Sequence, residues 1–187
     1  YEVASFLPDE VDLHFYDPEL GLPNEASGMD ALLIRTVTKI NSKRWQEIPE
    51  NLQFIGTGSS GTDHVDIPFL QSHNISFADA GGCNARSVAE YVAVSMLLWA
   101  DSFGIDLQKI TAGIVGVGHV GTQVNHILHE LGVKTILYDP PRANREAEFQ
   151  SSNLSEILHA DVLTMHTPLT QNGDFPTRHW LDSDKLA

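Results

Sequence analysis

The chain has 187 residues, of which 42% are hydrophobic and 19% charged, so it can bury a core and form one or two globular domains. Its formal net charge of −14, from 11 Lys and Arg against 25 Asp and Glu, argues against nucleic acid and anionic membranes as partners. We expect neither a membrane span nor a secretory leader, because no apolar run approaches ~18 residues. The only cysteine, Cys83, excludes a disulfide within the chain and is typical of a reducing compartment, so we expect a cytoplasmic protein.

The first eighty residues alternate short apolar runs with Gly- and Pro-containing turns, which predicts an α/β arrangement. Glycines at positions 56, 58 and 61 follow one of these runs, where the backbone must turn sharply or approach another group closely. In chain order we expect a strand at Val11–Tyr16, a buried strand at Ala31–Ile34, a short helix at Lys43–Glu47 capped by Asn41 or Ser42, a strand at Gln53–Thr57, a helix around Asp66–Ser72 and a strand at Ile75–Phe77.

The longest helix signal runs from about Ala85 to Ser102 and ends at Gly104. Asn84 can cap this helix, and Ser87 with Glu90 forms a possible capping box one turn later. Its expected buried face consists of Val88, Ala89, Val92, Ala93, Met96, Leu97 and Ala100. We place the domain boundary just after this helix, which gives one domain over residues 1–103 and a second over residues 104–187.

The second domain repeats the strand and helix alternation in the pattern β-α-β-α-β, the mononucleotide-binding half of a doubly wound Rossmann sheet. Only 22 residues follow Met165, too few for three more crossovers of ~30 residues each, so we expect this sheet to be incomplete in the chain. The expected elements are strands at Thr111–Val117, Lys134–Tyr138 and Asp161–Met165 and helices at His119–Leu131 and Leu154–His159.

Residues Gly116–Gly121, the glycine turn hereafter, match G-x-G-x-x-G at a junction between a strand and a helix. Gly116 permits a tight turn, Gly118 lets backbone amides reach a pyrophosphate, and Gly121 allows the helix to pack closely on the strand. The amides near His119 and Val120 point at the anion, aided by the helix dipole. The spacing therefore predicts a dinucleotide site, for a nicotinamide or, with less support, a flavin cofactor.

Asp139 lies 18 positions after Gly121 at the end of the next expected strand, where an acidic residue hydrogen-bonds the adenosine ribose. A carboxylate repels a 2′-phosphate, so the pattern favours NAD over NADP as cofactor. Arg142 and Arg145 follow closely and leave the NADP alternative open. At the end of the last expected strand, the backbone of His166, Thr167 and Pro168 would also face the ligand.

Four segments together resemble the D-2-hydroxyacid dehydrogenases: Thr62–Asp66, Gly82–Val92, the glycine turn and His166–Leu169. Within that family the segments Arg35–Lys39, Gly61–His64 and Asp139–Arg142 look most like the branch that oxidises 4-phospho-D-erythronate in pyridoxal-phosphate (vitamin B6) biosynthesis. The likeness covers roughly residues 30–187, and we expect the family's opening strand to be absent from the first thirty. It implies a flavodoxin-like substrate-binding domain followed by the NAD-binding Rossmann domain.

The resemblance also implies roles for individual residues. Thr36 and Ser59 match substrate contacts of the branch, while Ser60 and Gly61 lie in the loop that holds the substrate carboxylate in the wider family. Asp139 and Thr167 match NAD contacts. Thr36 stands where Ser is usual and Ser59-Ser60 where Thr-Ala is common, which weakens the choice of substrate more than that of the family. Arg35 either pairs with the substrate's phosphate or carboxylate or forms an internal salt bridge.

The family's catalytic Arg, Glu and His lie in segments beyond the equivalent of Ala187, so no residue here receives a catalytic role. We expect this 187-residue piece to be inactive alone, and the full-length protein to be a homodimer that oxidises 4-phospho-D-erythronate with NAD. The alternatives are another member of the family, such as a phosphoglycerate dehydrogenase, and a non-catalytic NAD-sensing relative. The full reading frame distinguishes an enzyme from a sensor.

The remaining candidate residues favour structural roles. His126 and His129 can share a helix face, but no third ligand completes a metal site, so we expect none. His64 is more simply a structural hydrogen-bond partner than a substrate contact. Cys83 has no partner for nucleophilic chemistry nearby and is interpreted as a buried small side chain.

Overall fold

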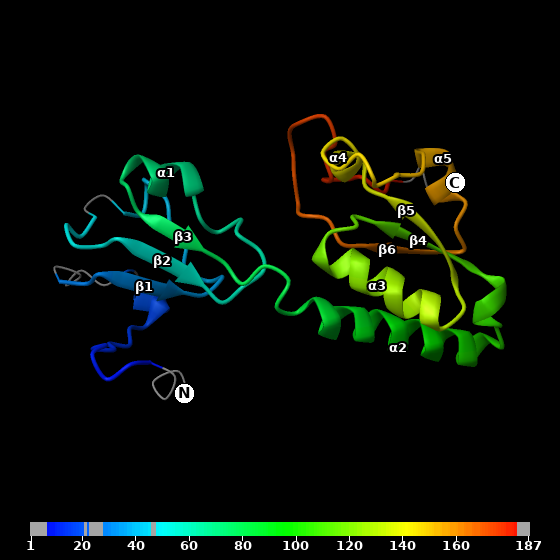
Figure 1. The fold of residues 1–187 in the computed structure, drawn as a ribbon, viewed down its shortest axis with the longest axis horizontal. Helices are drawn as coiled ribbons and strands as arrows, with labels where there is room; N and C mark the ends of the chain where they lie inside the picture. Colours follow the sequence, from blue (N-terminus) through cyan, green and yellow to red (C-terminus); the bar gives the residue numbers. More distant parts are fainter. Residues whose placement is uncertain (1–6, 21, 23–27, 46–47, 183–187) are drawn as a thin grey trace. The chain divides into compact units, whose positions relative to one another are not determined.

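The computed structural model describes residues 7–20, 22, 28–45 and 48–182, which belong to two compact units, Tyr1–Ala80 and Gly81–Ala187 (Figure 1). Each unit has its own three-stranded parallel sheet and its own helices. The predicted α/β fold class, with parallel sheets in both parts of the chain, is therefore confirmed.

The first unit is built on strands β1 (Ala31–Ile34), β2 (Phe54–Thr57) and β3 (Ser76–Ala78), in the order β1-β2-β3. Helix α1 (Ile67–Ser72) connects β2 to β3. It begins where predicted because the Asp66 carboxylate caps it, accepting a hydrogen bond from the Phe69 amide at 3.0 Å. A short 3-10 turn, η2 (Pro18–Leu20), precedes the sheet.

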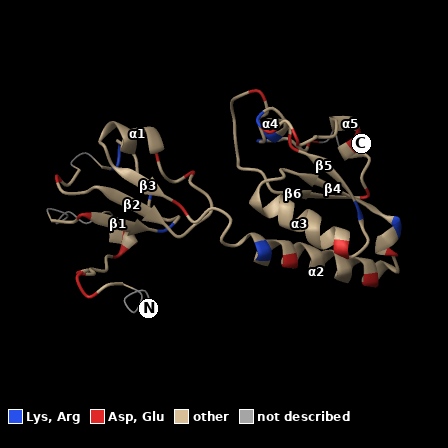
Figure 2. Ribbon diagram, viewed as in Figure 1, with Lys and Arg blue, Asp and Glu red and all other residues tan. Residues whose placement is uncertain are grey.

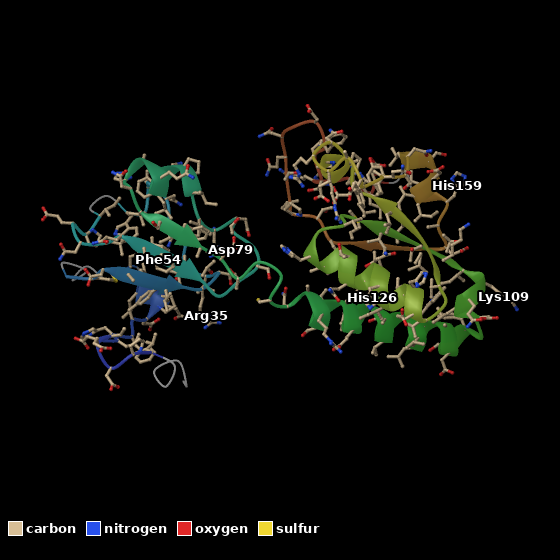
Figure 3. The ribbon with its side chains drawn as sticks, in the orientation of Figure 1. Arg35, Phe54, Asp79, Lys109, His126 and His159 are labelled. Atoms are coloured by element: carbon tan, nitrogen blue, oxygen red, sulfur yellow. The ribbon has the colours of Figure 1, made fainter. Side chains whose placement is uncertain are left out.

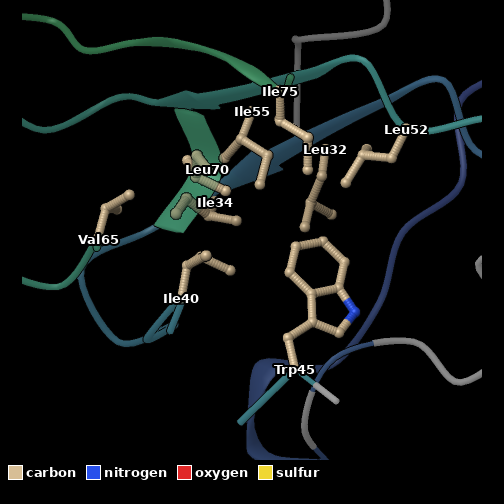
Figure 4. Packing of buried hydrophobic residues seen from close by; sticks show 9 residues of the cluster. All are labelled: Leu32, Ile34, Ile40, Trp45, Leu52, Ile55, Val65, Leu70 and Ile75. Atoms are coloured by element: carbon tan, nitrogen blue, oxygen red, sulfur yellow. The ribbon is translucent and has the colours of Figure 1, made fainter. Parts of the chain in front are cut away.

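The core of the first unit packs against one face of this sheet (Figure 4). Ile40 and Val65 form an isolated parallel bridge, so the segments that follow β1 and β2 close over the core together. The buried residues are Leu32, Ile34, Ile40, Trp45, Leu52, Ile55, Val65, Leu70 and Ile75. The prediction that β1 is buried holds for one face only, because Leu32 and Ile34 point inward whereas Leu33 is 54% exposed.

Two elements predicted for this unit do not form. Residues 11–17 are irregular, with Val11 47% and Phe15 72% exposed, because a short apolar run forms a strand only where another strand offers it hydrogen bonds. The predicted helix at Lys43–Glu47 is a turn over residues 42–44, held by amides that donate to the Asn41 side chain at 3.1 Å. Gln46 and Glu47, the last two residues of that prediction, lie outside the described residues.

The second unit carries strands β4 (Thr111–Val115), β5 (Lys134–Tyr138) and β6 (Val162–Met165) in a parallel sheet. Helix α3 (His119–Glu130) connects β4 to β5, while α4 (Pro140–Ala143) and α5 (Leu154–Leu158) lie between β5 and β6. All three predicted strands and both predicted helices of this unit are present, with ends that differ by at most two residues. The additional short elements are α4 and a 3-10 turn, η3 (Leu107–Lys109).

Helix α2 (Ala85–Phe103) packs along α3 (Figure 1) and ends at Gly104, as predicted; Gly104 has the left-handed conformation. The buried face of α2 consists mainly of alanines, so its side chains are smaller than those predicted. These small side chains let α2 and α3 approach closely. The stripe consists of Ala85, Ala89, Ala93, Met96 and Ala100, whereas Leu97 is 44% exposed. Glu90 pairs with Arg86 at 2.8 Å rather than forming the predicted capping box with Ser87.

The compact units divide between Ala80 and Gly81, about one helix earlier than the predicted boundary at residues 103 and 104. The difference arises because α2 contributes Ala89 and Met96 to the core of the second unit, beside Val124 and Leu128 of α3. Among the described residues, no helix is both long enough and apolar enough to span a membrane.

Candidate functional site

The strand order β5-β4-β6 gives the sheet of the second unit a topological switch point. The chain passes from β4 to β5 on one side and then returns to place β6 on the other side of β4, so the connections after β4 and β6 diverge. In open parallel sheets, ligands bind at the carboxyl ends of the two strands that flank such a switch point. The glycine turn follows β4, and His166–Pro168 follow β6, so the structure brings both predicted segments to this point.

Gly116 is the residue where the two segments meet. Its φ is +84°, a conformation that favours glycine, and an added Cβ would lie 2.7 Å from both the His166 carbonyl oxygen and the Thr167 Cγ2. The His166 amide donates to the Val115 carbonyl at 2.8 Å, which keeps the end of β6 against the turn. The close approach therefore needs glycine at position 116.

Gly118 and Gly121 occupy opposite environments in the glycine turn. Gly118 is the N-cap of the 12-residue helix α3, and an added Cβ there would meet no atom within 4 Å. Gly121 is buried, and an added Cβ would overlap the carbonyl oxygen of Gly116. The turn is thus closed on its inner side and open at the helix N-terminus, where His119 and Val120 begin the helix.

Asp139 connects the end of β5 to the glycine turn. Its Oδ2 accepts a hydrogen bond from the Val117 amide at 2.8 Å, and its Oδ1 caps α4 by accepting from the Arg142 amide at 2.9 Å. The Asp139 amide donates to the Ser151 hydroxyl at 3.0 Å, a contact that sequence reasoning missed because no pattern links the two positions. Asp139 therefore lies beside the turn, as the dinucleotide pattern requires.

Gly82 is a second neighbour of the turn that the sequence did not single out as a site residue. It has a φ of +81°, and an added Cβ would lie 2.9 Å from Cγ of the His119 ring. The segment before α2 thus runs beside the first residue of α3. Cys83, predicted to be buried, is exposed, because it precedes the buried stripe of α2, which begins at Ala85.

His166 is partly buried at the end of β6, and its Nε2 lies 2.9 Å from the Thr164 hydroxyl. Burial of the ring lowers the pKa of His166 below its ordinary value, because the charged form loses hydration. The imidazole is consequently neutral near pH 7. His166 therefore adds no positive charge at the switch point, whereas the N-terminus of α3 contributes positive potential there.

A second group of predicted residues gathers at the carboxyl edge of the first sheet. Ile34 pairs with Thr57 and Gly56 with Ala78, so the segments that begin at Arg35, Gly58 and Asp79 leave the sheet side by side. Figure 3 shows Arg35 and Asp79 at this same edge, with Phe54 at the opposite end of the sheet. Thr36 directly follows Arg35, and both are exposed.

Residues Gly58–Gly61, the serine loop hereafter, are held by a chain of hydroxyl contacts. The Thr57 hydroxyl lies 2.8 Å from that of Ser59, which donates to the Gly61 carbonyl at 3.0 Å. The Ser60 hydroxyl donates to the Ala80 carbonyl at 3.4 Å, which links the loop to the end of β3. An added Cβ at Gly58 would meet no atom within 4 Å, so backbone is accessible there.

His64 supports the serine loop from inside the first unit. It is 6% exposed, and its Nε2 lies 3.3 Å from the Thr57 hydroxyl, which confirms the predicted structural hydrogen bond. Its Nδ1 is buried without a hydrogen-bond partner among the described residues. An unpaired buried ring nitrogen is costly, so the contact of Nε2 with Thr57 offsets only part of the cost of burying the His64 ring.

Other candidates contribute little to either group of residues. The ion pairs between described residues do not include Arg35 or Lys39, so the internal salt bridge proposed for Arg35 is not formed there. His126 and His129 are both exposed, and no group of three or more His, Cys, Asp or Glu gathers in the described part of the chain. In Figure 2, Lys and Arg are scattered rather than gathered in a stripe, with blue residues present at α4 beside Asp139.

Comparison with known families gives a match over residues 1–178 to the model described as "D-isomer specific 2-hydroxyacid dehydrogenase, catalytic domain". Erythronate-4-phosphate dehydrogenase of Yersinia enterocolitica is 44% identical over 172 residues, which cover 91% of this chain and 45% of that protein. The enzyme of the same name from Escherichia coli O1:K1 is 47% identical over 154 residues, covering 82% and 40%. The chain thus spans less than half the length of these relatives.

Solved structures match at lower identity. NAD-bound 3-phosphoglycerate dehydrogenase of Entamoeba histolytica is 28% identical with a TM-score of 0.61, covering 76% of this chain and 47% of that one. D-lactate dehydrogenase of Aquifex aeolicus, solved with NAD and lactic acid, has a TM-score of 0.66 at 23% identity, covers 81% and 52%, and supports the fold alone.

The lowered pKa of His166 predicts a specific pH dependence of stability. The unfolded chain binds a proton at residue 166 below about pH 6.5, whereas the folded chain binds it only at lower pH. The stability contributed above that pH is therefore lost as pH falls through the lowered pKa. In urea unfolding, we expect His166→Gln, which keeps a polar group beside Thr164, to lose less unfolding free energy than wild type between about pH 7.5 and 5.5. Equal losses would contradict the assignment.

Proposed function

The chain belongs to the D-isomer specific 2-hydroxyacid dehydrogenases, and we propose that the full-length protein oxidises 4-phospho-D-erythronate at its 2-hydroxyl, with NAD as oxidant. The product is the 2-oxo acid 3-hydroxy-2-oxo-4-phosphobutanoate, in the pathway to pyridoxal phosphate. The observation that carries the proposal is the 44–47% identity to erythronate-4-phosphate dehydrogenases over most of the chain. The NAD-bound phosphoglycerate dehydrogenase neighbour supports the cofactor.

The second unit fits a dinucleotide. The turn is open at Gly118 and closed behind Gly121, so a diphosphate can approach the first amides of α3, where the helix dipole adds positive potential. Asp139 lies beside the turn and keeps acceptor capacity for ribose hydroxyls, since a carboxylate accepts about four hydrogen bonds. Its negative charge disfavours a 2′-phosphate, which supports NAD over NADP.

Thr167 and the backbone of His166 and Pro168 complete this proposed cofactor site on the β6 side of the switch point. NAD, when bound, accepts the hydride released from C2 of the substrate. His166 is neutral and the buried glycines carry no side chain, so neither supplies a charge to the diphosphate, and its contacts are proposed to be backbone amides.

The first unit is proposed to hold the substrate at the carboxyl edge of its sheet. Backbone amides of the serine loop, those of Ser59 and Ser60 among them, would bind the carboxylate. The loop is held in place by the Ser59 and Ser60 hydroxyls, which donate to backbone carbonyls, and through Thr57 and His64. Arg35, exposed and without an ion-pair partner among described residues, would bind the phosphate together with Thr36. Oxidation also releases the hydroxyl proton, and no residue of this chain is proposed as the base that takes it.

Steady-state kinetics of the full-length protein test the substrate. We expect kcat/KM with NAD to be at least ~100-fold higher for 4-phospho-D-erythronate than for 3-phosphoglycerate or D-lactate, because a polar site discriminates strongly against ligands that leave its groups unpaired. Turnover of 3-phosphoglycerate with none of 4-phospho-D-erythronate would replace the substrate and keep the reaction class. NADH binding without turnover of any 2-hydroxy acid would instead favour a sensor.

The two glycines with opposite surroundings test the cofactor site as a matched pair. Gly118→Ala should change the unfolding free energy by less than ~0.5 kcal/mol, because its Cβ meets no atom, yet weaken NADH binding about 10-fold by filling the space above the turn. Gly121→Ala should destabilise the protein by ~2–4 kcal/mol, because its Cβ overlaps the Gly116 carbonyl. Urea unfolding and NADH fluorescence titration measure the two effects, and wild-type NADH affinity in Gly118→Ala would refute the placement.

The proposal includes a homodimer formed through α2. On the face of α2 opposite its buried stripe lie Tyr91, Val94 and Leu98, which are 74%, 52% and 63% exposed. Such a face is self-complementary when two copies meet about a two-fold axis. Light scattering after size exclusion should give twice the chain mass, and Leu98→Asp should halve it; a monomeric wild type would contradict the dimer.

The proposal also includes a cytoplasmic location. It is supported by the single cysteine and can be tested by cell fractionation.

A further inference from the structure

We propose that Arg142 is a positioning residue for the glycine turn, which it holds in the conformation that receives the dinucleotide, rather than a ligand for a 2′-phosphate. This inference rests on the proposed cofactor. It is carried by the contacts of the guanidinium, which connect α4, after β5, to the turn after β4, 25 residues earlier in the chain.

The peptide groups on either side of Val117 are fixed by two different residues. The Val117 amide donates to Asp139 Oδ2 at 2.8 Å, and the Val117 carbonyl accepts from Arg142 Nη1 at 2.6 Å. Val117 itself is 2% exposed and lies between Gly116 and Gly118. Since Asp139 is the N-cap and Arg142 the third residue of one short helix, they act together to hold the centre of the glycine turn.

Other parts of the Arg142 side chain also contact the protein. Its Nε donates to Glu146 at 2.7 Å, and its guanidinium lies 4.5 Å from the centre of the Phe149 ring. Nη1 also lies 3.4 Å from the Thr122 hydroxyl in the first turns of α3. Three separate contacts therefore fix the direction of the planar group, and only 27% of the side chain is exposed.

These contacts separate two interpretations of an arginine that follows Asp139. An arginine that recognises a 2′-phosphate must present its donors to the ligand near the ribose, whereas Nε and Nη1 of Arg142 already donate to Glu146 and to the Val117 carbonyl. A turn held from both sides needs no rearrangement when a ligand arrives, so less free energy is lost on binding. The effect of Arg142 should consequently be the same for NADH and NADPH.

Arg145 provides a matched control. It lies three residues later and is exposed, and its side chain makes no hydrogen bond or ion pair in the described part of the chain. Arg142→Met and Arg145→Met remove the same charge from the same region, so they separate the contact with Val117 from general attraction of an anion. Glu146→Gln removes the ion pair but leaves the Val117 contact possible.

Fluorescence titration of the full-length variants with NADH and with NADPH tests the proposal. Arg142→Met should weaken binding of both nucleotides by the same factor, about 10-fold, the effect of one charge-assisted hydrogen bond. Arg142→Lys should lie between wild type and Arg142→Met, because Lys keeps the charge without the planar fork. Arg145→Met and Glu146→Gln should change binding less than 2-fold.

Steady-state kinetics give a second test. At saturating NAD the kcat of Arg142→Met should equal that of wild type, whereas its KM for NAD should be raised. A loss of stability alone would not alter KM well below the melting temperature.

Each of the other possible outcomes contradicts a different one of the proposals: the role of Arg142, the cofactor or the substrate. Wild-type NADH affinity in both Arg142 variants, or equal weakening in Arg142→Met and Arg145→Met, would refute the positioning role while leaving the proposed function intact. Weakening of NADPH alone would make Arg142 a phosphate ligand. A wild-type protein that binds neither nucleotide at millimolar concentration would refute the cofactor and this inference together, whereas NADH binding without oxidation of 4-phospho-D-erythronate would refute the substrate alone.

Discussion

The second unit depends on one close approach, between the start of helix α3 and the carbonyl of Gly116. A side chain at position 121 would overlap that carbonyl, and one at position 116 would overlap the end of β6. With both side chains absent, β4, α3 and β6 come near enough for their ends to share one small region. The open N-terminus of α3, the Asp139 carboxylate and the His166–Pro168 backbone all take their positions from this contact.

A chain with a net charge of −14 attracts few anions from a distance, so an anionic ligand must be held by short-range forces. Backbone amides at a helix N-terminus provide them without a mobile cation. The guanidinium of Arg142 lies beside the turn, but its contacts are with Val117, Glu146 and Phe149 of the protein. In the first unit Arg35 remains exposed, where a phosphorylated substrate would need a charge that can reach it.

The sequence predicted best where local chemistry decides the structure. The helix around Asp66–Ser72, the end of α2 at Gly104 and the apolar strands of both sheets were recognisable because neighbouring residues determine them. Val11–Tyr16 failed because a strand needs a partner, and Leu97 was misplaced because the alanines of α2 pack closer to α3. The Arg142 contact with Val117 and the Ser151 contact with Asp139 join residues far apart in the chain, so no spacing rule could have predicted them. The residues of the glycine turn and the serine loop were identified in advance, but the hydrogen bonds that hold them were not.

The strand order β5-β4-β6 also determines when this region is finished during translation. β4 leaves the ribosome first and pairs with β5 soon afterwards, whereas β6 must return to the far side of β4 from roughly 50 residues downstream. At about 5–20 residues per second, the nascent chain spends about 1 to 5 seconds between the end of β5 and the end of β6, and during this time the glycine turn is bounded on one side only. During that interval one flank of β4 has unpaired amides and carbonyls, the state most open to chaperones and to mispairing with another nascent chain.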